Sequence, residues 1–171
     1  YLTDALNYLF EYPYGCSEQL ASKIAAIAIA KRVYSFDSAK ELPNVTFNNV
    51  SCSASQAVQM GLDKIYDSQT VSGGFSFYKG LNANAHLTMQ VVNALLDVKK
   101  GGFAVRQAVL DNALVYLQEQ RSEFIKNNDT ASLVFDGYVL SRAGAGAAIA
   151  SEISTRINRT YLSDTANGSD L

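Results

Sequence analysis

The feature that most constrains this chain is the spacing of its apolar residues, which recur every three to four positions along almost all of the 171 residues. That period places side chains on one face of an α-helix, whereas a half-buried strand needs a period of two. The period is found over Cys16–Tyr34, about Ser55–Asp67, about Asn84–Lys99, about Val105–Gln120, about Thr130–Arg142, and a stretch after Gly146 that contains Ile149, Ile153 and Ile157. No convincing strand run accompanies them. The sequence therefore predicts an all-α fold.

The connections between these segments are short and contain glycine. Gly73-Gly74-Phe75 and Gly102-Phe103 each fall between two of the predicted helices. Glycine permits the tight turns that let one helix return along another, so the sequence predicts an array of antiparallel helical hairpins. Such an array either closes into a ring or stays open. The segment Glu41–Ser53 has no usable period and is predicted to be an exposed connection, and the polar tail 163–171 is predicted to be disordered.

Charge and composition exclude several classes of function. The formal net charge is −2, with no basic block, so we expect no nucleic-acid partner. The longest apolar stretch, Ile24–Ala30, is far short of the roughly 20 residues that cross a bilayer, so we expect no membrane span. No cluster of His, Cys, Asp or Glu has the spacing of metal ligands, and no glycine-rich loop follows a strand, so we expect no metal and no cofactor.

Asn-X-Ser/Thr sequons are frequent, and they begin at Asn44, Asn49, Asn128, Asn158 and Asn167. Such sequons are glycosylation acceptors in secreted chains, so they favour a secreted or extracellular glycoprotein. Polar loops rich in Asn, Ser and Thr produce the same pattern without any glycan, and that alternative stays open.

One segment, Glu11–Gln19, points to specific chemistry. Pro13 fixes one backbone angle, and Gly15 removes a side chain beside Cys16, which falls at the first turn of a nearly all-apolar helix. Gln19 follows three residues later, so the thiol and the carboxamide lie on the same face of that turn. Loss of ammonia would join them as an internal thioester, an acyl donor that survives only when it is shielded from water. Tyr12 and Tyr14 are candidates for that shield.

Other interpretations of these residues stay open at this stage. Cys16 could be an inert buried cysteine, or it could pair with Cys52 in a disulfide. Glu18 could be a general base or a carboxylate stabilised by the helix dipole. His86, the only histidine, could serve a Cys-His pair but more simply belongs to the surface or the packing of its helix.

Tyr12-Pro-Tyr-Gly-Cys-Ser-Glu-Gln19 resembles the thioester signature of the alpha-2-macroglobulin and complement superfamily, whose core pattern is Gly-Cys-X-Glu-Gln. Gly73-Gly74-Phe75-Ser-Phe-Tyr78, Leu87-Thr88 and Asn93-Ala-Leu-Leu96 follow in the order seen in that family's thioester domain. The resemblance implies an α/α toroid, of which residues 1–171 would be the N-terminal part, inside a larger protein. It also implies a thioester between Cys16 and Gln19 supported by Tyr12, Pro13, Tyr14, Gly15 and Glu18.

The resemblance further implies a single-use covalent inhibitor of proteases. In that family, cleavage of a bait segment elsewhere in the protein exposes the thioester, and a Lys amine of the protease is acylated by the glutamine carbonyl. An assisting histidine, where the family has one, would fall within residues 124–135, which contain none here. The alternatives are a complement-like opsonin that acylates surface hydroxyls, a toroidal enzyme of the terpene-cyclase or prenyltransferase kind, and a structural array with an inert cysteine. A bacterial periplasmic protein is the alternative to a secreted one.

Overall fold

The computed structural model describes residues 15–35, 42–47, 50–147 and 149–156, together with positions 4, 8 and 158. The elements are α2 (Ser17–Ser35), β1 (Val45–Phe47), β2 (Val50–Cys52), α3 (Ala54–Asp67), α4 (Ala85–Lys100), α5 (Gln107–Lys126) and α6 (Thr130–Arg142). Residues 149–156 are also helical. The chain forms two compact units, Tyr1–Tyr116 and Leu117–Leu171, and the boundary between them falls within α5.

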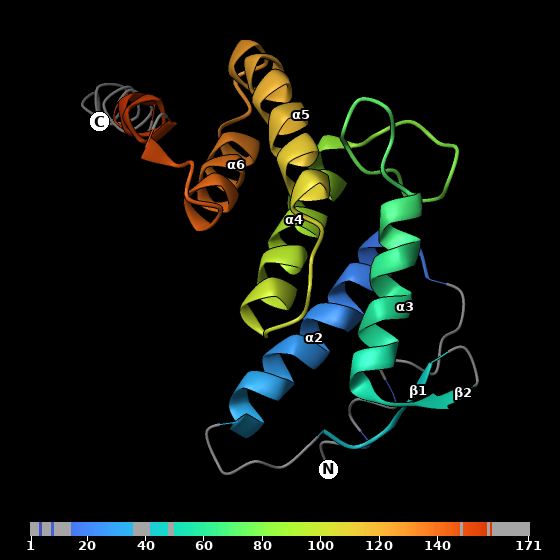
Figure 1. Ribbon diagram of the computed structural model, residues 1–171. Coiled ribbons are helices and arrows are strands. Elements are labelled where there is room, and N and C mark those ends of the chain that lie inside the picture. The colour runs from blue at the N-terminus through green and yellow to red at the C-terminus, as the bar shows by residue number, and fades with distance from the viewer. Residues whose placement is uncertain are drawn as a thin grey trace, which may run out of the picture. The chain divides into compact units, whose positions relative to one another are not determined.

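The first unit is organised around α2, which packs against both α3 and α4 (Figure 1). Ile24 and Ile27 of α2 expose no surface. The apolar residues that recur every three to four positions along α3 and α4 are buried: Val58, Leu62, Ile65, Leu87, Val91, Leu95 and Val98. Burial of aliphatic side chains of this size contributes about 1.5–3 kcal/mol each, so these three helices form the core of the unit. α4 ends at Lys100, directly before Gly101 and one residue beyond its predicted end at about Lys99.

Two glycines let the neighbouring elements approach α2 closely. A methyl group at Gly61 of α3 would overlap Cγ2 of Ile24, and one at Gly101 would lie 2.8 Å from Cβ of Ala28. Contacts below 3 Å do not occur between real side-chain carbons without movement of the backbone or the neighbour. The position of α2, the helix that begins beside Cys16, is therefore fixed from two sides.

The segment predicted to be an exposed connection instead contains a small β-hairpin. β1 and β2 pair antiparallel, with Val45 opposite Cys52 and Phe47 opposite Val50. Val45, Phe47 and Cys52 are buried, and β1 also contacts α3. The expectation of no strand was wrong here, because strands of three residues are too short to establish a period of two.

Apolar residues lie around most of the circumference of α2, but its neighbours cover only one side of the helix. Ile29 and Val33 are 45% and 63% exposed, although they continue the apolar pattern of the buried face. The packing partners α3 and α4 cover the side that contains Ile24 and Ile27.

The second unit contains the end of α5, α6 and the helical residues 149–156. Gly137 of α6 lies against Ile153, and a methyl group at Gly137 would overlap Cδ1 of Ile153. Arg121 of α5 and Asp136 of α6 form an ion pair with Nε and Oδ2 2.8 Å apart, and the Asp136 side chain is fully buried. The tail predicted to be disordered lies outside the described residues.

Candidate functional site

Cys16 directly precedes the first residue of α2 and accepts its first helical hydrogen bond. Leu20 donates its N–H to the Cys16 carbonyl at 3.0 Å, so Cys16 is the N-cap residue of the helix. Gln19 is then the third helical residue, and its side chain turns back toward the cap. The Cys16 N–H donates to Gln19 Oε1 at 3.2 Å. The structure thus places the carboxamide oxygen of Gln19 on the main-chain N–H of Cys16, and a bond between the thiol and the carboxamide stays a prediction.

The same local arrangement occurs at the N-terminus of α3 with a serine in place of the cysteine. Ser53 donates its N–H to Gln56 Oε1 at 2.9 Å, and Gln56 donates its N–H to Ser53 Oγ at 3.2 Å. This pair is a capping box, in which the side chains of the cap and the third helical residue satisfy each other's backbone groups. Cys16 and Gln19 form the carboxamide arm of such a box, with a thiol where the box of α3 has a hydroxyl.

The residue after the cysteine ties the start of α2 to the connection between α3 and α4. Ser17 is buried and makes two hydrogen bonds to the carbonyl of Phe77, from its N–H at 3.0 Å and from Oγ at 3.2 Å. Sequence reasoning missed this contact, because the two residues are 60 positions apart and the serine lies in the variable position of the signature.

The connection that supplies the Phe77 carbonyl is itself held at several points. Gln69 Nε2 donates to the carbonyls of Gly73 and Val109 at 2.9 and 2.8 Å, which links the connection to α5. The Phe75 N–H donates to Thr88 Oγ1 at 2.8 Å, which links it to α4. The motifs Gly73–Tyr78 and Leu87-Thr88 therefore build one framework that reaches the start of α2.

Two supporting residues of the predicted site are placed beside Gln19. A Cβ at Gly15 would lie 3.4 Å from Cβ and 3.5 Å from Oε1 of Gln19, so the glycine leaves room for the side chain to fold back. Glu18 lies half-buried in the first helical turn, where a carboxylate is stabilised by the helix dipole. The other predicted supporting residues, Tyr12, Pro13 and Tyr14, lie outside the described residues.

The remaining candidate residues, Cys52 and His86, lie in other elements, the hairpin and α4. Cys16 and Cys52 are both free thiols in the structure, which therefore contains no disulfide between them. Cys52 is buried in the hairpin, its Sγ lies 3.7 Å from the Val45 carbonyl, and burial raises the pKa of its thiol. His86 is exposed in the first turn of α4, in agreement with the interpretation as a surface residue.

Three of the predicted glycosylation sites fall in the described part of the chain. Asn44, Asn128 and Asn158 are exposed, and Asn128 has a positive φ of 54°. Asn49 and Asn167 lie outside the described residues. Exposure permits glycosylation but does not test it, so the glycans stay a prediction.

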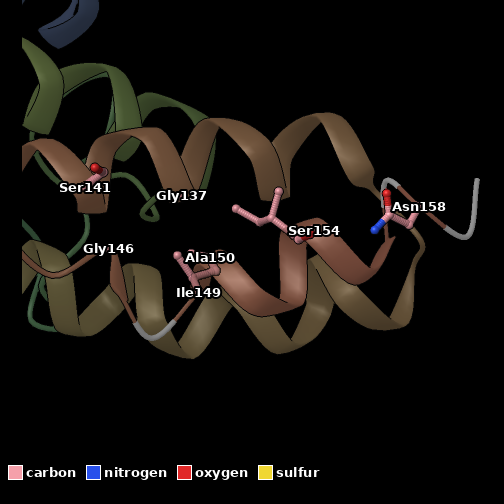
Figure 2. Close-up of a pocket in the computed structure, with 8 residues that line it drawn as sticks. Gly137, Ser141, Gly146, Ile149, Ala150, Ser154 and Asn158 are labelled. Carbon is pink, nitrogen blue, oxygen red and sulfur yellow. The ribbon is translucent and has the colours of Figure 1, made fainter.

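A pocket of about 420 Å³ lies in the second unit, between α6 and the helical residues that follow it. Figure 2 shows Gly137 and Ser141 on one side of it and Ile149 and Ser154 on the other, with Asn158 at its edge. Its lining holds no acid, base or thiol. Within the described ranges, no group of three His, Cys, Asp or Glu residues could hold a metal, and no helix is long and apolar enough to cross a membrane.

The described fold and site define a class of protein, a helical domain that holds a cysteine and a glutamine together at the start of a buried helix. The family model described as the A-macroglobulin TED domain matches residues 2–149. The chain belongs to this family. The prediction of an all-α fold of the toroid class, made from the helical period and the resemblance, is thereby confirmed.

Curated relatives share the match at the level of sequence. The chain is 34% identical over 153 residues to an alpha-2-macroglobulin of Xylella fastidiosa, which covers 80% of this chain and 9% of that protein. It is 26% identical over 121 residues to an alpha-2-macroglobulin of Thermotoga maritima, covering 71% of this chain and 7% of that one. The chain therefore spans less than a tenth of the length of these relatives.

Solved structures share the fold. Salmonella alpha-2-macroglobulin reacted with methylamine superimposes with a TM-score of 0.64 at 19% identity, over 92% of this chain and 11% of that chain. The native conformation of the Escherichia coli alpha-2-macroglobulin gives a TM-score of 0.52 at 16% identity, over 91% of this chain and 12% of that chain.

Proposed function

We propose that the chain is the thioester-bearing part of a larger macroglobulin, and that Cys16 and Gln19 form an internal thioester that captures proteases. The observation that carries the proposal is the hydrogen bond of 3.2 Å from the Cys16 N–H to Gln19 Oε1, which holds the carboxamide on the cysteine residue. The thiol supplies the sulfur of a thioester, and the carboxamide supplies its acyl carbon. The eight-residue signature from Tyr12 to Gln19 supports the same assignment.

Capture would be a single acyl transfer. A Lys amine of the protease attacks the Gln19 carbonyl carbon, the bond from that carbon to Cys16 Sγ breaks, and an amide and a free thiol result. The thioester is consumed, so the protein inhibits stoichiometrically and does not turn over. Because the chain is a small fraction of its relatives, the bait that proteases cleave and the domains that move would lie elsewhere in the protein.

The reaction of a structurally similar protein supports the choice of nucleophile. The Salmonella structure is described as reacted with methylamine, a small primary amine. We propose that this chain reacts with amines in the same way. We also propose an exported protein, and the bacterial origin of the matched relatives supports the periplasmic alternative over a secreted eukaryotic glycoprotein.

Intact mass measurement tests the proposal. Thioester formation lowers the mass by about 17 Da, one ammonia, and methylamine then adds about 31 Da and releases one thiol. We expect Cys16→Ser and Gln19→Ala to show neither change. Cys16→Ser keeps a cap like Ser53 of α3, so loss of helix content does not explain its result. A wild-type protein with the full mass of a free cysteine and glutamine, and no thiol released by methylamine, would refute the proposal.

A further inference from the structure

The start of α2 raises the question of what holds Cys16 and Gln19 in position while the thioester forms. We propose that Ser17 is the positioning residue of that step, and that its two hydrogen bonds to the Phe77 carbonyl fix the first turn of α2 as a template in which the cysteine meets the carboxamide. The inference rests on the proposed function, and it adds a residue that lies at the unspecified position of the Gly-Cys-X-Glu-Gln pattern.

The template follows from the capping arrangement. At Ser53 the box holds the glutamine carboxamide at the cap by a hydrogen bond from the cap N–H. At Cys16 the same bond holds the carboxamide of Gln19, and the side chain of the cap is a nucleophile. The carboxamide bond of a capping box thus keeps the two reacting residues on one helical turn, which is the proximity that an acyl transfer needs.

The same N–H assists the chemistry. Cys16 Sγ adds to Cδ of Gln19, and the charge that develops on Oε1 is stabilised by the Cys16 N–H that already donates to it at 3.2 Å. The bond from Cδ to the amide nitrogen then breaks. The thiol proton leaves with that nitrogen as ammonia, so the thioester forms without an oxidant or any other reactant.

This arrangement is efficient only if the first turn is rigid, because helix termini fray. Ser17 supplies that rigidity by tying the first turn to a carbonyl outside the helix. It is buried, and both of its hydrogen bonds end on a carbonyl in the connection that Gln69 and Thr88 tie to α5 and α4. The hydroxyl bond is specific to the serine, whereas the N–H bond exists for every residue except proline.

This difference allows a graded test. Ser17→Ala removes the hydroxyl bond, Ser17→Thr keeps a hydroxyl, and Ser17→Pro removes both bonds while proline remains a favoured residue at the first helical position. Ser55→Ala, an exposed serine in the first turn of α3, is the matched control. The measurement is the rate at which the mass deficit appears after cell-free synthesis of the protein, together with helix content and the unfolding midpoint.

We expect Ser17→Ala to form the thioester about three- to tenfold more slowly, as the loss of one neutral hydrogen bond predicts, and Ser17→Pro about ten- to a hundredfold more slowly. Ser17→Thr and Ser55→Ala should match the wild type, and helix content should be unchanged in all four. Wild-type rates in Ser17→Ala and Ser17→Pro would overturn the inference and leave the thioester intact. A slow Ser17→Thr, or a slowing matched by a lower unfolding midpoint, would show a structural role only. A wild type without the mass deficit would refute the proposed function itself.

Discussion

The connection between α3 and α4 offers a matched pair of glycines for a quantitative prediction. Gly73 and Gly80 have nearly the same backbone conformation, with φ of 91° and 88°. Their surroundings differ. A methyl group at Gly80 would meet nothing within 4 Å, whereas one at Gly73 would overlap the main-chain oxygen of Asn112 and lie 2.9 Å from its carbonyl carbon. Alanine at the two positions therefore separates backbone strain from steric overlap.

The magnitude follows from these two contributions. A left-handed backbone costs a residue with a Cβ about 1–2 kcal/mol, and the loss of unfolded-state freedom on replacing glycine offsets about 0.4–1 kcal/mol of that. Both contributions are common to the two variants. Gly73→Ala alone must also push against the backbone of α5, which cannot rotate away as a side chain can, and overpacking of this kind costs about 1–3 kcal/mol. We therefore expect the free energy of unfolding of Gly73→Ala to be about 1–3 kcal/mol lower than that of Gly80→Ala.

Urea unfolding followed by circular dichroism measures the difference, read as a lower midpoint at an unchanged slope. The variants also differ in function, because Gly73 belongs to the connection that presents the Phe77 carbonyl to Ser17. We expect slower thioester formation in Gly73→Ala and the wild-type rate in Gly80→Ala. Equal midpoints for the two variants would refute the steric reasoning, and equal rates of thioester formation would refute the link from the connection to the cysteine.

Three further predictions concern other groups. Cys16 should resist a thiol reagent until methylamine is added and should react afterwards. Cys52 should react slowly throughout, because it is buried and its thiol pKa is raised. Labelling of Cys16 before methylamine is added, detected by mass spectrometry, would contradict this prediction. Burial raises the pKa of the Asp136 carboxyl and Arg121 opposes that rise, so folded Asp136 keeps its proton to a higher pH than the unfolded chain does, and stability falls as pH rises from about 4 through the raised pKa. Arg121→Gln should raise the pKa of Asp136 further and lower the free energy of unfolding by about 3–5 kcal/mol at pH 7 but by less at pH 5. An equal loss at the two pH values, measured by urea unfolding, would contradict this prediction. Methylamine should outcompete equimolar glycerol by adduct mass, because a hydroxyl needs a general base; a dominant glycerol ester that disappears in His86→Ala would instead favour the opsonin alternative.

The helices could be predicted because their signals are local, and so could the placement of Cys16 and Gln19 on one helical turn. A period of three to four residues identifies a helix within one segment, and Cys16 and Gln19 meet because they are three residues apart on the same turn. The buried faces of α3 and α4 followed from that period without knowledge of their partners.

The rest depends on contacts between distant segments. The bond from Ser17 to Phe77 joins residues 60 positions apart and leaves no pattern near either one. The exposure of Ile29 and Val33 depends on which side of α2 its neighbours cover, and a periodic pattern does not contain that information. The hairpin was missed for another reason. Its strands have only three residues each, and they lie in a segment with Pro43 and two sequons, which is typical of a loop.

The exposure of the two reacting residues separates formation of the thioester from its protection. The contacts described above that position Cys16 and Gln19, from the Phe77 carbonyl to the anchor at Val109, lie in the first unit, so we expect formation of the proposed thioester to depend on them. Protection has a different source. Gln19 is exposed and Cys16 is half-buried in the described structure. A thioester formed between them would survive only where water is kept from its acyl carbon, so the proposed function predicts cover from the tyrosine shield or from another domain.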